Sequence, residues 1–104
     1  MIRPELISEI KNSVGFELIC ANQEFPLFSS PHEGYAVIKE EIEEAVEESH
    51  GAAENLEVLW SVIRENGMGF ESVGYIKERA IKAAAEFVQV AAMCDKYLAS
   101  ASSR

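Results

Sequence analysis

A heptad pattern that stays in register from Pro31 to Glu65 constrains the fold of this chain most. Apolar or small residues recur at its a and d positions: Tyr35, Ile38, Ile42, Ala45, Ser49, Ala52, Leu56, Leu59 and Ile63. The segment Ser30-Pro31-His32-Glu33 forms a capping box with proline at the first helical position, which marks a helix start. An unbroken register predicts one helix of about 50 Å at 1.5 Å per residue. A kink or break near Gly51 is the alternative.

Helical patterns flank this segment at about residues 4–22 and 71–99. The first has one apolar face, and the last is apolar nearly all round, which predicts a central, largely buried helix. With no strand pattern, the predicted fold class is all-α: an antiparallel bundle of three long helices. We expect oligomerisation to complete this bundle, because a chain of this size has a thin core. Residues 100–104 are predicted to form a flexible tail.

Length and charge restrict the possible partners. The 104 residues suffice for one domain, 1–104. The net charge of −9 argues against nucleic-acid polymers and anionic membranes as partners, since both require a basic surface. No apolar run reaches membrane length and no signal peptide opens the chain, so a cytoplasmic protein is expected. Cys20 and Cys94 lie in apolar helical patterns, which predicts buried, reduced thiols.

The acidic run at residues 40–48 contains six glutamates that divide between two helix stripes. Three lie on a stripe that is polar throughout and needs no function: Glu40, Glu43 and Glu47. The other three lie on a stripe bracketed by apolar residues: Glu41, Glu44 and Glu48. Like charges one helical turn apart repel each other, unless water or a cation lies between them. An ordinary acidic helix face is the alternative interpretation.

The last helical segment adds a second polar feature. Between Lys82 and Asp95 every residue is apolar except Glu86 and Gln89, which stand three apart and share a face. A glutamate in such surroundings is costly to bury unpaired, so it requires a cation, a basic partner or a proton. The alternative to a metal site is a salt bridge from Glu86 to Arg79 or Lys82.

Together the two helices offer four oxygen-bearing side chains: Glu41, Glu44, Glu86 and Gln89. Facing each other, they would line a pocket of the kind that Mg²⁺ or Mn²⁺ prefers. A bound cation of this type recruits phosphates and orients a water molecule for attack on a phosphoanhydride. Four basic side chains are candidates for binding the phosphate oxygens of a nucleotide: Lys39, Lys77, Arg79 and Lys82.

Two stretches resemble a known family. Glu-Glu-Ile-Glu-Glu-Ala, followed some 40 residues later by Glu-Phe-Val-Gln in an Ala-rich helix, resembles the MazG-like all-α nucleoside triphosphate pyrophosphohydrolases. Ser-Pro-His-Glu-Gly-Tyr-Ala-Val-Ile-Lys-Glu-Glu and the later Gln-Val-Ala-Ala-Met are similar to small phage and prophage members. The resemblance extends over about residues 5–98.

The resemblance implies a site and an activity. Glu41 and Glu44 match the family's ExxE motif, Glu86 matches the first residue of its ExxD motif, and Gln89 stands where the family has aspartate. The family converts NTPs or dNTPs to monophosphate and pyrophosphate with Mg²⁺, which makes a nucleoside triphosphate the expected substrate. The charge missing at Gln89 implies weaker metal binding. Glu48 is the candidate base that orients the attacking water.

The resemblance also implies assembly as a homodimer or homotetramer. The alternative function is a non-catalytic, oligomeric helical scaffold or interaction protein of phage origin that keeps the fold without the activity. Gln89 favours this alternative, because glutamine brings no negative charge to a metal site.

Overall fold

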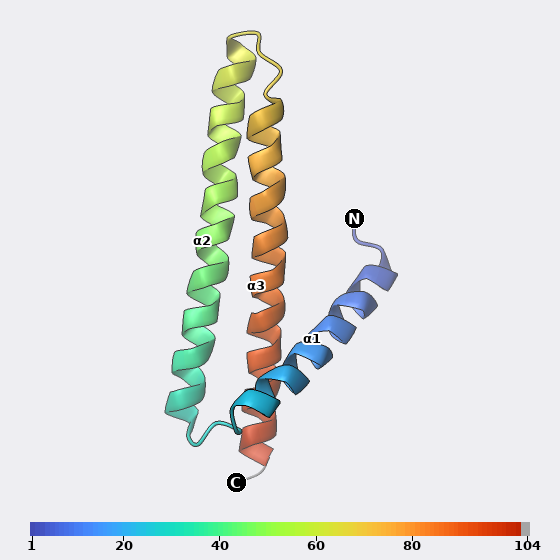
Figure 1. Cartoon of the computed structure of the whole chain (residues 1–104), viewed down its shortest axis with the longest axis vertical. Helices are drawn as coiled ribbons and strands as arrows, with labels where there is room; N and C mark the ends of the chain where they lie inside the picture. The colour runs from blue at the N-terminus through green and yellow to red at the C-terminus, as the bar shows by residue number, and fades with distance from the viewer. Residues whose placement is uncertain (103–104) are drawn as a thin grey trace. The chain divides into compact units, whose positions relative to one another are not determined.

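The structure, a computed structural model, describes residues 1–102, with side chains as far as Ala101. These residues form three α-helices and no strand: α1 (Pro4–Glu24), α2 (Pro31–Arg64) and α3 (Phe70–Ser102) (Figure 1). The predicted all-α class is confirmed. None of the three helices combines the length and the apolar character needed to cross a membrane.

Helix α2 is continuous through Gly51, so the prediction of a single helix is confirmed and the alternative, a break near Gly51, does not occur. At its start the Ser30 hydroxyl accepts a hydrogen bond from the Glu33 N–H at 3.1 Å. The Glu33 carboxylate accepts from the N–H of Ser29 at 3.4 Å and from its hydroxyl at 3.0 Å. The capping box therefore forms, but its return bond goes to Ser29 rather than to Ser30.

Local backbone chemistry ends the first two helices. Phe25 precedes a proline and takes an extended conformation, which stops α1 two residues beyond the predicted end. After α2, Asn66 adopts a left-handed conformation with φ 65°, and the Gly67 N–H donates to the Val62 carbonyl at 2.9 Å. This is a Schellman-type cap with asparagine, not glycine, at the left-handed position.

Helix α3 continues beyond its predicted end. Ser100 is buried, and its hydroxyl accepts from the Phe28 N–H at 2.9 Å and donates to the Lys96 carbonyl at 2.7 Å. The predicted flexible tail is therefore wrong for residues 100–102, because Ser100 connects the helix end to the loop before α2. Residues 103–104 lie outside the described part of the chain.

The chain divides into two compact units, and α2 and α3 each contribute to both. The three-helix unit comprises Met1–Ile42 and Phe87–Arg104. It contains α1, the first part of α2 and the last part of α3. Its core is a cluster of buried apolar side chains: Val14, Phe28, Ala92 and Met93.

The hairpin unit comprises residues 43–86. In it the second part of α2 and the first part of α3 run antiparallel, joined by a short loop (Figure 1). Its buried hydrophobic residues are the small Ala45 and Ala83, which let the two helices approach closely. Trp60 is 54% exposed. Whether the two units together form one domain stays a prediction.

The predicted burial of α3 is wrong within the single chain. Large apolar side chains along it are exposed, with Ile81 at 56%, Phe87 at 47% and Leu98 at 63%. The physical reason is geometric, since each neighbouring helix covers only one stripe of α3 and the remaining stripes stay open. The predicted burial of Cys20 is also wrong, because this thiol is exposed, while Cys94 is half-buried.

Candidate functional site

Three of the four side chains predicted to bind a metal lie close together. Glu41, Glu44 and Glu86 each offer one carboxylate oxygen, and these three oxygens lie within 4.8 Å of one another. Glu41 stands one helical turn before Glu44 on the unbroken α2, and Glu86 faces Glu44 from α3 within the hairpin unit. We call these three residues the acidic cluster. Acidic groups commonly gather at protein surfaces without an ion, so this geometry alone assigns no metal.

Electrostatics at the acidic cluster favour binding of a proton or a cation. The pKa of Glu44 is raised above its ordinary value, first by partial loss of hydration and then by the charge of Glu86. A hydrogen bond between the two carboxyl groups and the charge of Glu47 raise this pKa further. Like charges at this distance favour a shared proton, and a divalent cation would relieve the same repulsion by displacing that proton.

Gln89, the fourth predicted ligand, has a partner on α1. Its amide nitrogen donates a hydrogen bond to the Glu17 carboxylate at 2.8 Å. This bond directs the amide nitrogen towards α1 and leaves the carbonyl oxygen as the group that could accept or coordinate. Sequence reasoning missed Glu17, although a glutamate between Phe16 and Leu18 carries the same signal that singled out Glu86.

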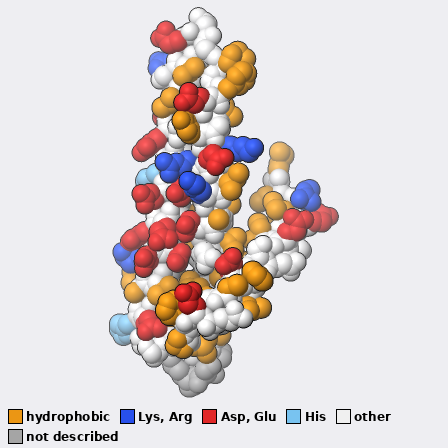
Figure 2. Space-filling model, viewed as in Figure 1, with side chains coloured by type: hydrophobic (Ala, Val, Ile, Leu, Met, Phe, Trp, Pro, Cys, Tyr) orange, Lys and Arg blue, Asp and Glu red, His pale blue; other side chains and the backbone are white. Residues whose placement is uncertain are grey.

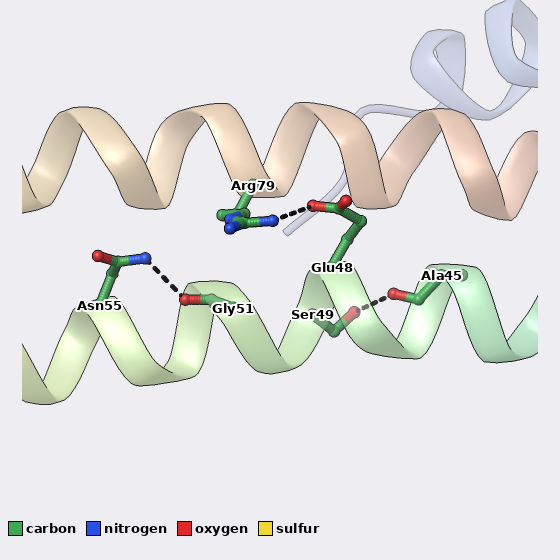
Figure 3. Close-up of polar contacts among 6 residues, drawn as sticks. All are labelled: Ala45, Glu48, Ser49, Gly51, Asn55 and Arg79. Atoms are coloured by element: carbon green, nitrogen blue, oxygen red, sulfur yellow. Dashed lines mark hydrogen bonds and ion pairs between the residues drawn. The ribbon is translucent and has the colours of Figure 1, made fainter.

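Glu48, the predicted base, forms an ion pair with Arg79 (Figure 3). The Arg79 guanidinium lies 3.1 Å from the Glu48 carboxylate, and the two side chains are 44% and 22% exposed. Gly51 leaves room for this arginine, since a Cβ there would lie 3.0 Å from the arginine Nε. The pair gives Glu48 and Arg79 a structural role beside their predicted roles in catalysis and phosphate binding. Arg79 therefore pairs with Glu48, whereas the alternative prediction paired Glu86 with Arg79 or Lys82.

Two further hydrogen bonds in this part of the hairpin unit remain within α2 (Figure 3). The Ser49 hydroxyl donates to the Ala45 carbonyl at 3.1 Å, and the Asn55 amide donates to the Gly51 carbonyl at 2.8 Å. Both side chains satisfy their donors on the backbone one turn earlier. Neither needs a ligand to explain its position.

The remaining basic candidates are exposed. Lys39, Lys77 and Lys82 all lie at the surface. Figure 2 shows acidic side chains gathered over α2, with basic side chains beside them. Their predicted contact with phosphate oxygens stays a prediction.

A pocket in the three-helix unit was not predicted from the sequence. It has a volume of ≈ 730 Å³, and the residues that line it include Glu17, Glu41 and Gln89. Its other residues come from the end of α1, the following loop, the start of α2 and the last part of α3. Helix periodicity could not predict that these residues line one pocket, because the loop after α1 brings them together.

Comparison with protein-family models, with curated proteins and with solved structures finds no match to this chain. The resemblance to MazG-like pyrophosphohydrolases therefore stays a prediction that rests on the residues quoted above.

Proposed function

We propose that this protein is a Mg²⁺-dependent nucleoside triphosphate pyrophosphohydrolase, which converts an NTP or dNTP to the monophosphate and pyrophosphate. One observation carries the proposal: Glu41, Glu44 and Glu86 bring carboxylate oxygens within 4.8 Å of one another. Two of these residues belong to the motif on α2 and the third to the motif on α3. The resemblance in sequence supports the same assignment.

The donor set of the acidic cluster fits a hard divalent cation. Three carboxylate oxygens suit Mg²⁺ or Mn²⁺, which take six oxygen ligands and keep positions for water and phosphate. Such a cation, when bound, supplies charge neutralisation at the phosphoanhydride and a more acidic water. The chain itself would hold the cation through Glu41, Glu44 and Glu86, with the carbonyl oxygen of Gln89 as a weaker donor.

Other side chains would act on the substrate and the water. Glu48 would orient the attacking water, and its ion pair with Arg79 fixes the position of its carboxylate. Lys39, Lys77 and Lys82 would contact phosphate oxygens as point charges. We propose that the protein acts in the cytoplasm as a homodimer or homotetramer, whose contacts would cover exposed apolar side chains.

The direct test is pyrophosphate release from a panel of NTPs and dNTPs with Mg²⁺. We expect activity in the native protein and none in the double variant Glu41→Ala/Glu44→Ala. The matched control is Glu40→Ala/Glu47→Ala, which removes two charges from the solvated stripe of the same helix and should retain activity. Absence of release above the Glu41→Ala/Glu44→Ala background would refute the proposal.

Metal binding tests the site separately from the chemistry. Calorimetry with Mn²⁺ should detect uptake that Glu86→Ala abolishes and Glu40→Ala leaves unchanged. Gln89→Asp, which restores the charge of the family pattern, should bind Mn²⁺ more tightly than the native protein. Equal affinity in all four proteins would show that the acidic cluster binds no metal.

A second candidate function is a non-catalytic, oligomeric helical scaffold. It is favoured by the bond from Gln89 to Glu17, which engages the amide that replaces the family's charged ligand. Sedimentation velocity and the Mn²⁺ titration separate the two candidates. A stable oligomer without metal uptake or pyrophosphate release supports the scaffold, and metal-dependent release supports the enzyme.

A further inference from the structure

The pocket of the three-helix unit combines apolar walls with hydrogen-bonding groups of both kinds. Phe25, Phe28, Val37 and Met93 are among its apolar lining residues. At ≈ 730 Å³ it is within the size range of small-molecule sites, which are mostly apolar with a few placed polar groups. Flat aromatic ligands suit such walls, because ring stacking and apolar burial both contribute to binding.

The charges of the pocket decide which end of a nucleotide it could hold. Four glutamates line it, Glu17, Glu24, Glu33 and Glu41, against a single lysine, Lys96. This excess of negative charge repels a triphosphate. An uncharged heteroaromatic end is not repelled, and its N–H donors would find acceptors in the carboxylates.

Lys96 provides a donor at the pocket wall. Its side chain is buried, with the residue only 3% exposed. Its ammonium donates to the Phe25 carbonyl at 3.5 Å and lies 5.0 Å from the centre of the Phe28 ring. An ammonium carries three N–H donors, so these two contacts leave a third for a ring nitrogen or carbonyl of a ligand.

The hydrogen bond between Gln89 and Glu17 determines which of their atoms can accept a hydrogen bond from a ligand. Because the Gln89 amide nitrogen donates to Glu17, the Gln89 carbonyl oxygen is the group left to accept. The Glu17 carboxylate has two oxygens and accepts more than one hydrogen bond. Both groups suit an amino group, in the way that glutamate accepts from the N4 amine of cytosine.

We infer that this pocket binds a nucleobase that carries an exocyclic amino group, and prefers it to a base that lacks one. This inference rests on the proposed function, which identifies the ligand as a nucleotide. Glu41 connects the two sites, because it both lines the pocket and belongs to the acidic cluster.

Binding of nucleosides, without phosphates or metal, tests this inference independently of hydrolysis. Calorimetry compares nucleosides whose bases carry an exocyclic amine with counterparts that lack it. Cytidine is compared with uridine, and adenosine and guanosine are compared with inosine. We expect at least one amino nucleoside to bind about tenfold or more tightly than its counterpart without the amine. Glu17→Gln should reduce this ratio several-fold, and Glu40→Gln, outside the pocket, should leave it unchanged.

The outcomes separate the two proposals. Preferential nucleoside binding without NTP hydrolysis supports the pocket and refutes the enzyme. NTP hydrolysis without preference for amino bases supports the enzyme and overturns the pocket. Absence of nucleoside binding also overturns the pocket proposal. Binding of putrescine but of no nucleoside overturns it as well, because it would show that the acidic lining binds simple amines.

Discussion

The three-helix unit and the hairpin unit use the same two long helices and bury them differently. In the three-helix unit α1 lies against them, and large side chains such as Phe28 and Met93 are buried. In the hairpin unit two helices pack only against each other, and the buried hydrophobic residues are two alanines, Ala45 and Ala83. A helix pair covers one stripe of each partner, so a third element is required to enclose large apolar groups.

The largest expected difference concerns large aromatic residues. Phe28→Ala should lower the free energy of unfolding by roughly 3–5 kcal/mol, because Phe28 is only 6% exposed and removal of its ring leaves a cavity. Trp60→Ala, in the hairpin unit, should cost less than about 1 kcal/mol, since Trp60 is half exposed and the centre of its ring lies 5.8 Å from the Arg64 guanidinium.

Urea unfolding followed by circular dichroism measures both effects. Equal losses at the two positions would contradict the comparison. A loss at Trp60 that grows with protein concentration would sharpen it, because it would show that a second copy covers the hairpin unit.

Glycines provide the next contrast. Gly34 in α2 faces the ring of Tyr97, and a Cβ there would also lie 3.2 Å from the Phe28 ring. Gly34→Val should therefore cost roughly 1–3 kcal/mol through overpacking. Gly74→Ala, in the hairpin unit, meets no atom within 4 Å and should stabilise the protein by about 0.5–1 kcal/mol through helix propensity. Thermal unfolding of both variants checks the signs, and destabilisation by Gly74→Ala would contradict an open face at this position.

A smaller effect is expected from the ion pair of the hairpin unit. Both Glu48 and Arg79 are partly exposed, so a double-mutant cycle with Glu48→Gln and Arg79→Gln should give a coupling of about 0.2–1 kcal/mol. The coupling should fall at 1 M NaCl, because salt screens charges near the surface. A coupling that salt leaves unchanged would indicate a pair shielded from solvent, contrary to the exposure seen here.

The smallest effect is a pH dependence at Glu44. Its pKa in the folded state is raised by partial desolvation and by Glu86, so the folded protein binds a proton more readily than the unfolded chain. Stability should therefore fall as pH rises from the ordinary glutamate pKa of 4.5 through the raised value, and then level off.

Urea unfolding midpoints, measured at intervals of about one pH unit between pH 4 and pH 8, should reveal this dependence. Glu44→Gln should remove it, and Glu40→Gln should leave it in place. An identical profile in the native protein and Glu44→Gln would show that the repulsion between Glu44 and Glu86 does not affect folding. Addition of Mn²⁺ should flatten the native profile if the acidic cluster binds the cation.

Local patterns predicted the helices well because helices are local structures. The heptad register predicted a continuous α2, and the capping box placed its first residue. The spacing placed Glu41 and Glu44 on one face of α2, but that Glu86 faces Glu44 depends on how α2 and α3 pack against each other. The bonding of Gln89 to Glu17 was not predictable, because it depends on where α1 lies against α3.

Sequence alone determined the three helices and the division of the glutamates between two stripes, since both follow from the 3.6-residue period. Tertiary structure decided which apolar side chains are buried, which partner each polar group takes and where a pocket forms. Ser100 shows the reason. Nothing near it in the sequence predicts its burial, which results from a hydrogen bond to Phe28, 72 residues away.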